Sequence, residues 1–247
     1  MSSKKITSSS NPHIKQIVKI RKDKNARKAE GKVLVVGKKA IQDAQKKRPI
    51  HTFITTKKRI GKRPKAKKVL KVTKEVMKKI TNVKSPEDVA AIIEIGDEEI
   101  KDKNYVLILD NISDPGNLGT IIRSANAFSF NLIIISNHST DPYSEKALRA
   151  AKGATFFIPI KIFTEKEILD FIKDNKLNAY LADIKGEDID EVDFEKPMAL
   201  IVSNEAKGPS AWAKEIAKSF TIPIKKDIDS LNAAIAGSIA MFEMRRS

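Results

Sequence analysis

The second half of the chain alternates short apolar segments with longer segments of helical periodicity. Strands that alternate with helices favour a mostly parallel sheet that is covered by helices on both faces. The sequence therefore predicts an α/β fold for this half. We expect strands at residues 106–109, 131–136, 156–160, 179–182, 198–202 and 220–224, and helices at 117–128, 141–152, 165–175, 211–218 and 230–246.

The first of these units has the sequence YVLILDNISDPGNLGTIIR, residues 105–123. An apolar run that suits a buried strand is followed by a turn-rich loop and by residues at helical spacing. Such a loop lies at the carboxyl end of the sheet, where open α/β sheets bind ligands. Its two glycines allow the backbone to come close to another group. Taken alone, the stretch favours a simpler interpretation, in which Asn117 is a helix N-cap and Arg123 a solvated helix residue.

Two further loops follow apolar strands and carry small or polar residues. Together with 110–117, the loops at 203–210 and 225–232 suit a binding site at one edge of the sheet. The chain has neither a P-loop nor a G-x-G-x-x-G fingerprint, which disfavours a nucleoside triphosphate or dinucleotide site. Its three histidines lie in unrelated contexts, at His13, His51 and His138. We therefore predict no metal site and no Ser-His-Asp catalytic system.

Charge is distributed unevenly along the chain. The net charge is +16. It divides into +21 for residues 1–95, which contain 28 Lys and Arg against 7 Asp and Glu, and −5 for residues 96–247, with 19 against 24. This asymmetry predicts two units, one of which binds a polyanion such as RNA or DNA. A lysine-rich compositional bias without a partner is the alternative.

The basic first part has the pattern of a small α/β domain. We predict a basic helix that ends at Gly31, strands at 32–36, 51–55, 69–73 and 89–94, and helices at 38–47 and 74–80. The highly charged stretch Lys57–Lys68 is too polar to pack and is predicted to be an exposed loop. It is either a contact to the polyanion or simply a solvated loop. The predicted organisation is a basic domain at 1–95, a solvated linker at 96–104 and the alternating domain at 105–247.

Cellular context is constrained by what the sequence lacks. Cysteine is absent, which excludes disulfides and thiolate metal sites and fits a reducing compartment. No apolar run approaches the length of a membrane span, and the first residues, MSSKKITSSSNPH, have no apolar stretch typical of a secretory signal. We therefore predict a soluble cytoplasmic protein without a membrane segment.

Three motifs resemble those of a known family. DPGNLGTIIRSANAF, LIVSNEAKG and IPIKKDIDSLNAAIAGSIAMFE, in this order and spacing, are similar to the motifs of the SpoU/TrmH branch of the SPOUT RNA methyltransferases. The resemblance covers residues 105–247. More weakly, ITSSSNPHIKQIVKI and TNVKSPEDVAAII resemble the substrate-binding domain of the ribosomal-protein-L30e type that is often fused to these enzymes.

The resemblance implies a fold and a reaction. The family has an α/β fold with a deep C-terminal trefoil knot, and it transfers a methyl group from S-adenosylmethionine to a ribose 2′-hydroxyl of rRNA or tRNA. It usually acts as a homodimer. By alignment of the motifs, the cofactor-binding positions are Ser203, Ile222 and Leu231, and the catalytic polar residues are Asn117, Arg123, Glu205, Ser230 and Asn232.

The reaction suggests a role for each of these polar residues. The enzyme must align the ribose oxygen with the methyl group and stabilise the charge that forms on the oxygen. We assign the second task to Arg123, which stays protonated at neutral pH and therefore holds the geometry while the proton passes to phosphate or water. We expect Asn117 to orient Arg123 or the RNA backbone, and Glu205 to tie loops together through backbone donors. The list is completed by Ser230 and Asn232, which are expected to shape the nucleotide pocket or cap the final helix.

Three positions depart from the family pattern and leave alternatives open. The family usually has Gly at Ser203 and a small residue, often Gly, at Ala206; a positive φ there would be costly for this chain. In the N-terminal domain, Val36 replaces a common Glu. The main hypothesis is an active RNA 2′-O-methyltransferase. The alternatives are an RNA-binding protein on the same fold with weak or lost activity, and an unrelated α/β nucleotide-binding module.

Overall fold

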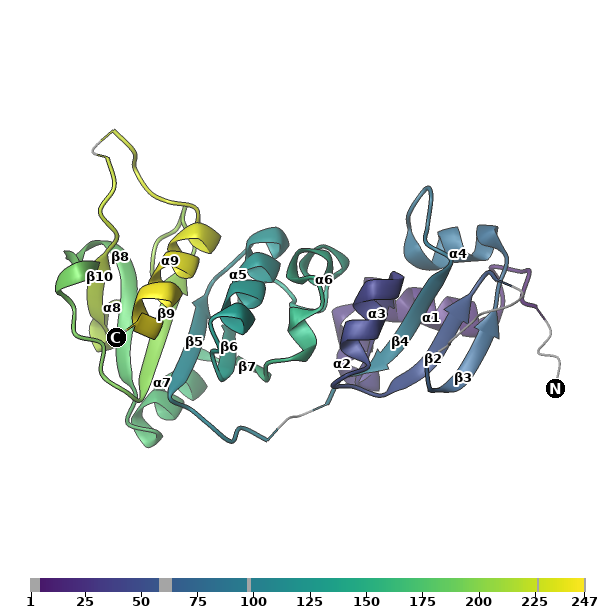
Figure 1. The fold of residues 1–247 in the computed structure, drawn as a ribbon, viewed down its shortest axis with the longest axis horizontal. Helices are drawn as coiled ribbons and strands as arrows, with labels where there is room; N and C mark the ends of the chain where they lie inside the picture. Colours follow the sequence, from purple (N-terminus) through teal and green to yellow (C-terminus); the bar gives the residue numbers. More distant parts are fainter. Residues whose placement is uncertain (1–4, 58–63, 97–98, 226, 247) are drawn as a thin grey trace. The chain divides into compact units, whose positions relative to one another are not determined.

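The computed structural model describes residues 5–57, 64–96, 99–225 and 227–246 (Figure 1). The chain divides into two compact units, Met1–Asp97 with Tyr143–Glu145 and Glu98–Pro142 with Lys146–Ser247. We call them the N-terminal and C-terminal units and describe each by itself.

The N-terminal unit is built on a four-stranded mixed sheet. The strand order is β1-β4-β2-β3, in which β4 runs antiparallel to both neighbours and β3 runs parallel to β2. Apolar side chains from α1, α4 and the sheet form one core, which includes Ile14, Ile54 and Met77. The elements are α1 (Pro12–Lys22), α2 (Lys24–Glu30), β1 (Lys32–Val36), α3 (Lys38–Ala44), β2 (Ile50–Thr55), β3 (Ala66–Lys71), α4 (Lys74–Thr81) and β4 (Val89–Glu94).

The single basic helix predicted before Gly31 is in fact two helices. Asp23 adopts an extended backbone, with φ −113° and ψ 115°, and ends α1. Its carboxylate then accepts hydrogen bonds from the backbone N–H groups of Asn25 and Ala26, at 2.8 and 3.3 Å, and so caps α2. Gly31 ends α2 in the left-handed region, at φ 59°, as predicted. The prediction missed the break because Asp is an ordinary solvated residue in a charged helix.

The C-terminal unit contains a six-stranded parallel sheet, which confirms the predicted α/β class. The strand order is β10-β8-β9-β5-β6-β7, and all five pairings are parallel. The knotted path of the C-terminal segment stays a prediction. The elements are β5 (Tyr105–Asp110), α5 (Pro115–Ala127), β6 (Leu132–Ser136), α6 (Glu145–Ala151), η1 (Ala154–Phe156), β7 (Ile160–Phe163), α7 (Glu165–Asp174), β8 (Asn178–Asp188), η2 (Ile189–Glu191), β9 (Met198–Ser203), α8 (Ala211–Ile216), β10 (Lys218–Thr221) and α9 (Ala233–Arg246).

The sheet of the C-terminal unit has a hydrophobic core on each face. Along β5, Leu107 and Leu109 pack on one side and Val106 and Ile108 on the other, because successive side chains of a strand alternate between faces. Helices α5 and α9 cover the first face and lie side by side in Figure 1, joined by a hydrogen bond between the Ser124 and Ser238 hydroxyls. The second face is covered by residues of α7 and α8. The carboxyl ends of the central strands are thereby held in fixed positions.

One predicted strand is wrong. The apolar run 156–160 was expected to be a strand, but residues 154–156 form η1 and the strand β7 begins only at Ile160. Phe156 and Ile158 are nevertheless buried, at 2% and 4% exposure. Gly153, at φ 92°, reverses the chain after α6. The apolar segment that follows therefore enters the core as the tight turn η1. Hydrophobicity thus predicted burial correctly but not backbone conformation.

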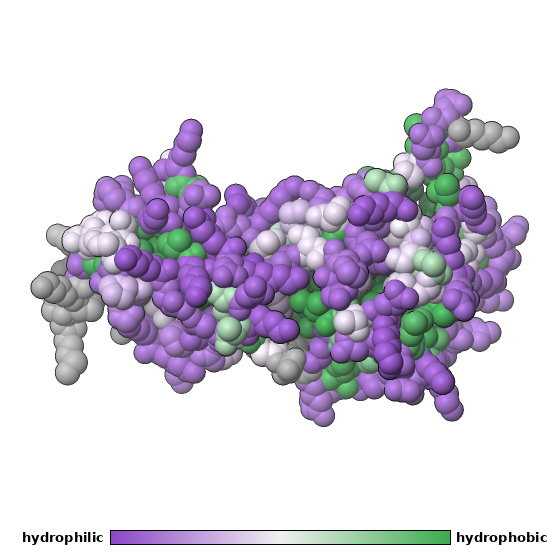
Figure 2. Space-filling model, turned by 180° about the vertical axis from the view of Figure 1, so that it is seen from behind, coloured by the Kyte–Doolittle hydropathy of each residue, from purple (hydrophilic) through white to green (hydrophobic). Residues whose placement is uncertain are grey.

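The face of the molecule seen in Figure 2 is mostly polar. In Figure 2, hydrophilic residues cover most of the visible face and apolar residues form smaller areas between them. No helix in the described ranges is both long and apolar enough to cross a bilayer. Residues 58–63, the centre of the basic loop predicted at Lys57–Lys68, lie outside the described residues, whereas Ala66–Lys68 belong to β3.

Candidate active site

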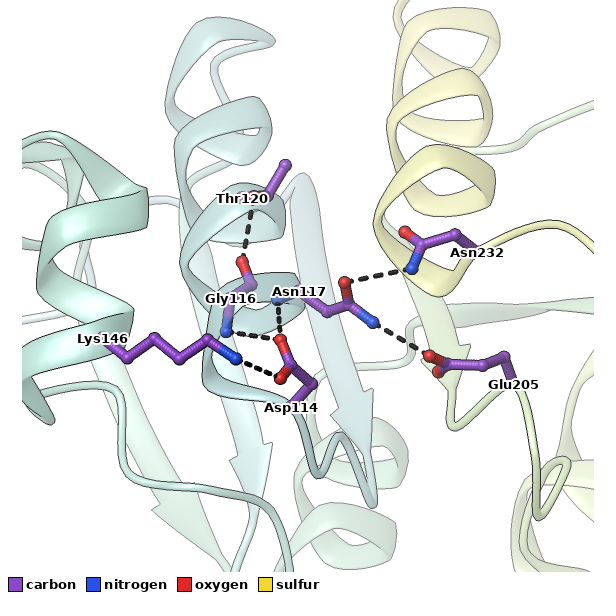
Figure 3. Close-up of polar contacts among 7 residues, drawn as sticks. All are labelled: Asp114, Gly116, Asn117, Thr120, Lys146, Glu205 and Asn232. Carbon is purple, nitrogen blue, oxygen red and sulfur yellow. Dashed lines mark hydrogen bonds and ion pairs between the residues drawn. The ribbon is translucent and has the colours of Figure 1, made fainter.

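The three motif loops, which are far apart in sequence, meet at the side chain of Asn117 (Figure 3). Its amide nitrogen Nδ2 donates to Oε1 of Glu205 at 3.0 Å. Its amide oxygen Oδ1 accepts from Nδ2 of Asn232, also at 3.0 Å. Asn117 therefore joins the loop after β5 to the loops after β9 and before α9. The predicted convergence of the three loops is confirmed by these two hydrogen bonds.

Asn117 is held in place because α5 begins with a strong cap. Asp114 is the N-cap, and its Oδ1 accepts from the backbone N–H groups of Gly116 and Asn117 at 2.7 and 2.9 Å. Pro115 occupies the first helical turn, where its missing N–H would have had no partner. The simple interpretation of Asn117 as the N-cap is therefore wrong by three residues. Asn117 lies inside the first turn, which leaves its side chain available for the other loops.

Helix α6 contributes a further contact to this cap. Lys146 Nζ donates to Asp114 Oδ2 at 2.6 Å and lies across Gly116, where a Cβ atom would stand 3.4 Å from Lys146 Cε. The hydrogen bond from Lys146 lowers the pKa of Asp114, and the hydrogen bond from the Asn117 backbone lowers it further. A carboxylate beside the positive end of a helix is also favourable electrostatically.

We expect Asp114→Ala to lower the free energy of unfolding by about 1 kcal/mol at pH 7. Because the folded-state pKa of Asp114 is lowered, its stabilisation is complete above the unfolded pKa of about 4 and is lost as the pH falls through the folded-state pKa. Urea unfolding at several pH values measures this: the difference from wild type should shrink on acidification. Asp114→Asn is the control that keeps a cap acceptor without the charge. A constant difference at every pH would contradict the assignment.

A buried carboxylate that sequence reasoning did not select ties the first loop to the second. Asp110, at 1% exposure, ends β5 and accepts hydrogen bonds from the Ser210 backbone N–H and hydroxyl, both at 2.8 Å. It also accepts from Asn111 Nδ2 at 3.0 Å and from the Ser203 hydroxyl at 3.3 Å. A buried charge requires such compensation. The sequence signal that could have identified Asp110 is an acidic residue at the end of an otherwise apolar strand.

Asn204 is the second residue that sequence reasoning missed. It is 5% exposed, and its Nδ2 donates to Ser113 Oγ at 2.9 Å and to the Asn111 carbonyl at 3.2 Å. Its Oδ1 accepts from the backbone N–H groups of Ala206 and Lys207 at 2.9 and 3.0 Å. One amide thus shapes its own loop and fastens it to the loop after β5.

The departures at Ser203 and Ala206 do not strain the backbone. Among the described residues that are not glycine, positive φ values occur at five positions, and neither of these two is among them. The left-handed conformation of this loop occurs at Gly208, with φ 69°, where glycine is present. The Ser203 hydroxyl has its own acceptor in Asp110, at 3.3 Å. The loop therefore keeps its conformation with the residues of this chain.

The remaining predicted residues are not all brought together. Arg123 lies on α5, is exposed, and makes no hydrogen bond or ion pair with a described residue; the predicted orientation of Arg123 by Asn117 is not observed. Ser230 is exposed, Leu231 is half-buried, and Ile222 packs partly against the core beyond β10. Asn232 caps α9 by accepting from the Ala234 N–H at 2.9 Å, so its predicted capping role is confirmed.

Glu205 ties loops together, as predicted, but through a different donor. Backbone N–H groups were expected to reach its carboxylate, whereas the donor in the structure is the side-chain amide of Asn117. Glu205 is an exposed residue. An amide donor from another motif makes the position of Glu205 depend on the whole tertiary structure.

Comparison with known proteins gives two family matches. A model described as the SpoU rRNA Methylase family matches residues 104–242, which is more than half of the chain. A second, described as the MRM3-like substrate binding domain, matches residues 11–91. The two matched segments lie on either side of the predicted linker.

Individual proteins agree with these matches. The 23S rRNA (guanosine(2553)-2′-O)-methyltransferase RlmP of Bacillus subtilis is 28% identical over 70% of this chain and 71% of that protein. The AdoMet-bound rRNA methyltransferase from Sinorhizobium meliloti has a TM-score of 0.86 and 31% identity, covering 98% of this chain and 97% of that one. AviRb from Streptomyces viridochromogenes, crystallised with AdoMet, shares the fold, with a TM-score of 0.86, 24% identity and coverage of 96% and 97%. The chain belongs to the SpoU rRNA methylase family.

Proposed function

We propose that this protein transfers a methyl group from S-adenosylmethionine to a ribose 2′-hydroxyl of RNA, either rRNA or tRNA. The observation that carries the proposal is the junction at Asn117, where hydrogen bonds of 3.0 Å connect the three motif loops in a member of the SpoU family. The enzyme of B. subtilis that resembles this chain is named for 2′-O-methylation of 23S rRNA, and the S. meliloti structure was solved with AdoMet.

The loops of this chain fit the cofactor. S-Adenosylmethionine supplies an electrophilic methyl group on sulfur when it is bound. The backbone at Ser203 and Ala206 has no positive φ, and Ser203 is held by Asp110 rather than left to project. Ile222 and Leu231 are partly exposed apolar residues that flank the loop before α9. We assign these positions, with Ser203, to the walls of the cofactor site, where backbone groups are the principal polar contacts.

The catalytic task falls on the polar residues around this site. Asn117, Glu205 and Asn232 hold the three loops in register, which fixes the alignment of the ribose oxygen with the methyl group. Arg123 stabilises the charge that develops on the oxygen and contacts the adjacent phosphate. Because its guanidinium stays protonated, the hydroxyl proton leaves to phosphate or water. Ser230 is exposed beside Asn232 and borders the nucleotide pocket.

We also propose that the segments predicted as domains divide the work. Residues 1–95 bind RNA, residues 96–104 are a linker, and residues 105–247 carry the reaction. The net charge of +21 on residues 1–95 supports the first role, because lysine and arginine neutralise phosphates without regard to base sequence. The absence of cysteine fits action in the cytoplasm.

We propose a homodimer that packs through the exposed side of α9. Ile235 is 53% exposed and Phe242 is 46% exposed on this helix, and the Phe242 ring lies 5.9 Å from that of Phe128 at the end of α5. Large apolar residues grouped on one helix face favour a protein contact. Sedimentation should show a dimer for the wild type and a loss of the dimer for Phe242→Glu. A monomeric wild type would end this part of the proposal.

Two measurements test the function. Calorimetry should detect binding of S-adenosylmethionine to the purified protein, and mapping of ribose methylation in rRNA and tRNA from cells with and without the gene should identify one missing methyl group. Absence of cofactor binding at millimolar concentration would instead favour the alternative, an RNA-binding protein on the same fold. That alternative was motivated by Ser203 and Ala206, and the unstrained backbone at both positions weakens it.

A further inference from the structure

Two adjacent hollows on the N-terminal unit each have three lysines in their lining. The first has a volume of about 440 Å³ and lies where α1 meets α4. The second, of about 430 Å³, lies at the start of α4 and the end of β2. Glu75 borders both. The cations of the first hollow are Arg21, Lys22, Lys78 and Lys79, and those of the second are Lys5, Lys57 and Lys74.

Cations outnumber carboxylates in the lining of both hollows, four against one in the first and three against two in the second. The side chains of Lys22, Lys78 and Lys79 in the first hollow form no ion pair or hydrogen bond with any residue that the structure describes, and the same holds for the side chains of Lys5 and Lys74 in the second. Three other lysines of this unit do have a carboxylate partner: Lys32 pairs with Glu30 at 3.4 Å, Lys46 with Asp43 at 2.7 Å and Lys67 with Glu94 at 2.7 Å. Arg21, the fourth cation of the first hollow, already has a carboxylate partner in Glu145, at 2.7 Å.

The two carboxylates of the hollows, Glu75 and Asp88, are too few to balance all of these cations. Asp88 accepts from the Thr56 hydroxyl and pairs with Lys57 at 3.5 Å, so it is already engaged. Glu75 is the remaining acidic residue, at the boundary between the hollows. Like charges gathered within a Debye length repel one another, and an anion that enters between them relieves this repulsion.

The neutral lining residues favour a phosphate rather than an apolar or aromatic ligand. Thr7 and Ser9 offer hydroxyl donors and Asn82 an amide donor in the first hollow. Hydroxyl, amide and ammonium groups are the usual partners of phosphate oxygens in nucleic-acid complexes. Neither hollow is lined by an aromatic residue, so stacking of an unpaired base has no platform here.

We infer that the hollows on either side of Glu75 bind the phosphodiester backbone of the substrate RNA. The inference rests on the proposed function and locates, on one face of the N-terminal unit, the surface that receives the RNA. Because the contacts are to phosphate, they position the RNA and do not read its bases. Selection of the methylated nucleotide is then left to the C-terminal unit.

The test compares two triple variants with equal loss of charge. Lys22→Gln, Lys78→Gln and Lys79→Gln remove the cations of the first hollow, whereas Lys28→Gln, Lys39→Gln and Lys84→Gln remove exposed lysines of the same unit outside both hollows. The probe is a fluorescent single-stranded RNA oligonucleotide of mixed sequence, and affinity is measured over a series of salt concentrations. The slope of log affinity against log salt should fall by about 0.7 for each lost contact, or roughly 2 for the first variant.

The expected result is a large loss of affinity and slope for the first variant and a small one for the control. Equal losses in both would overturn the inference and leave general electrostatic attraction as the explanation. Calorimetry with S-adenosylmethionine separates the proposed methyltransferase function from the proposed RNA surface. If the protein binds the cofactor normally and both triple variants lose RNA affinity equally, only the location of the RNA surface is refuted. A wild type that methylates RNA but shows no salt-dependent binding would also refute it.

Discussion

Replacement of Arg123 by alanine is expected to lower kcat for RNA methylation by about 10²–10³-fold, the usual cost of removing one charge-stabilising donor from an active site. The loss should fall on kcat rather than on cofactor affinity, because the proposed cofactor-binding positions lie on other loops. The fold should be unaffected, since the exposed side chain makes no hydrogen bond or ion pair with a described residue. Surface substitutions of this kind usually change stability by less than about 0.5 kcal/mol.

Single-turnover methylation with saturating RNA and cofactor measures this effect, and thermal unfolding checks the fold. Arg123→Lys keeps the positive charge but loses the planar fork of donors, so it should recover only part of the rate. Asn126→Ala changes another exposed residue of α5 and is the matched control. Full activity of Arg123→Ala would remove the assignment and return Arg123 to the status of a solvated helix residue.

Substitution of Gly119 by alanine is expected to destabilise the C-terminal unit by about 1–3 kcal/mol, despite the higher helix propensity of alanine. Gly119 lies in α5, where it packs closely against α6. A Cβ atom there would stand 2.3 Å from the Ala147 carbonyl oxygen, 2.7 Å from Ala150 Cβ and 3.0 Å from the Ala151 nitrogen. Two of these three are backbone atoms, so the contact can be relieved only by moving one helix away from the other.

The same displacement should reach the proposed active site. Moving α5 from α6 would lengthen the 2.6 Å contact between Lys146 and Asp114 and shift Asn117, which follows the cap. We therefore expect weaker methylation together with lower stability, measured by urea unfolding and by the methylation assay. Gly96→Ala is the control, because Gly96 has no positive φ and nothing lies within 4 Å of the added atom. Equal stability of the two variants would contradict the close packing of α5 on α6.

Much of the architecture could be predicted from the sequence because it depends on local patterns. The apolar run of β5, the helical spacing in α5 and the glycine after α2 each depend on neighbours a few residues away, so the class of the C-terminal unit and most element positions followed. Where two conformations bury the same side chains, this information fails. Phe156 and Ile158 of the run 156–160 are buried, and a tight turn after Gly153 buries them as well as a strand would.

The candidate site divides in the same way. The motifs indicated three loops, and the structure joins Asn117, Glu205 and Asn232, which were predicted as catalytic polar residues, in one hydrogen-bond network. The partner of each was decided only by the tertiary structure, since residues 88 and 115 positions apart meet at a single amide. Asp110 and Asn204 were missed because their roles arise from burial at the sheet edge. A carboxylate or an amide becomes structurally decisive only when the fold removes it from water and leaves protein groups as its hydrogen-bond partners.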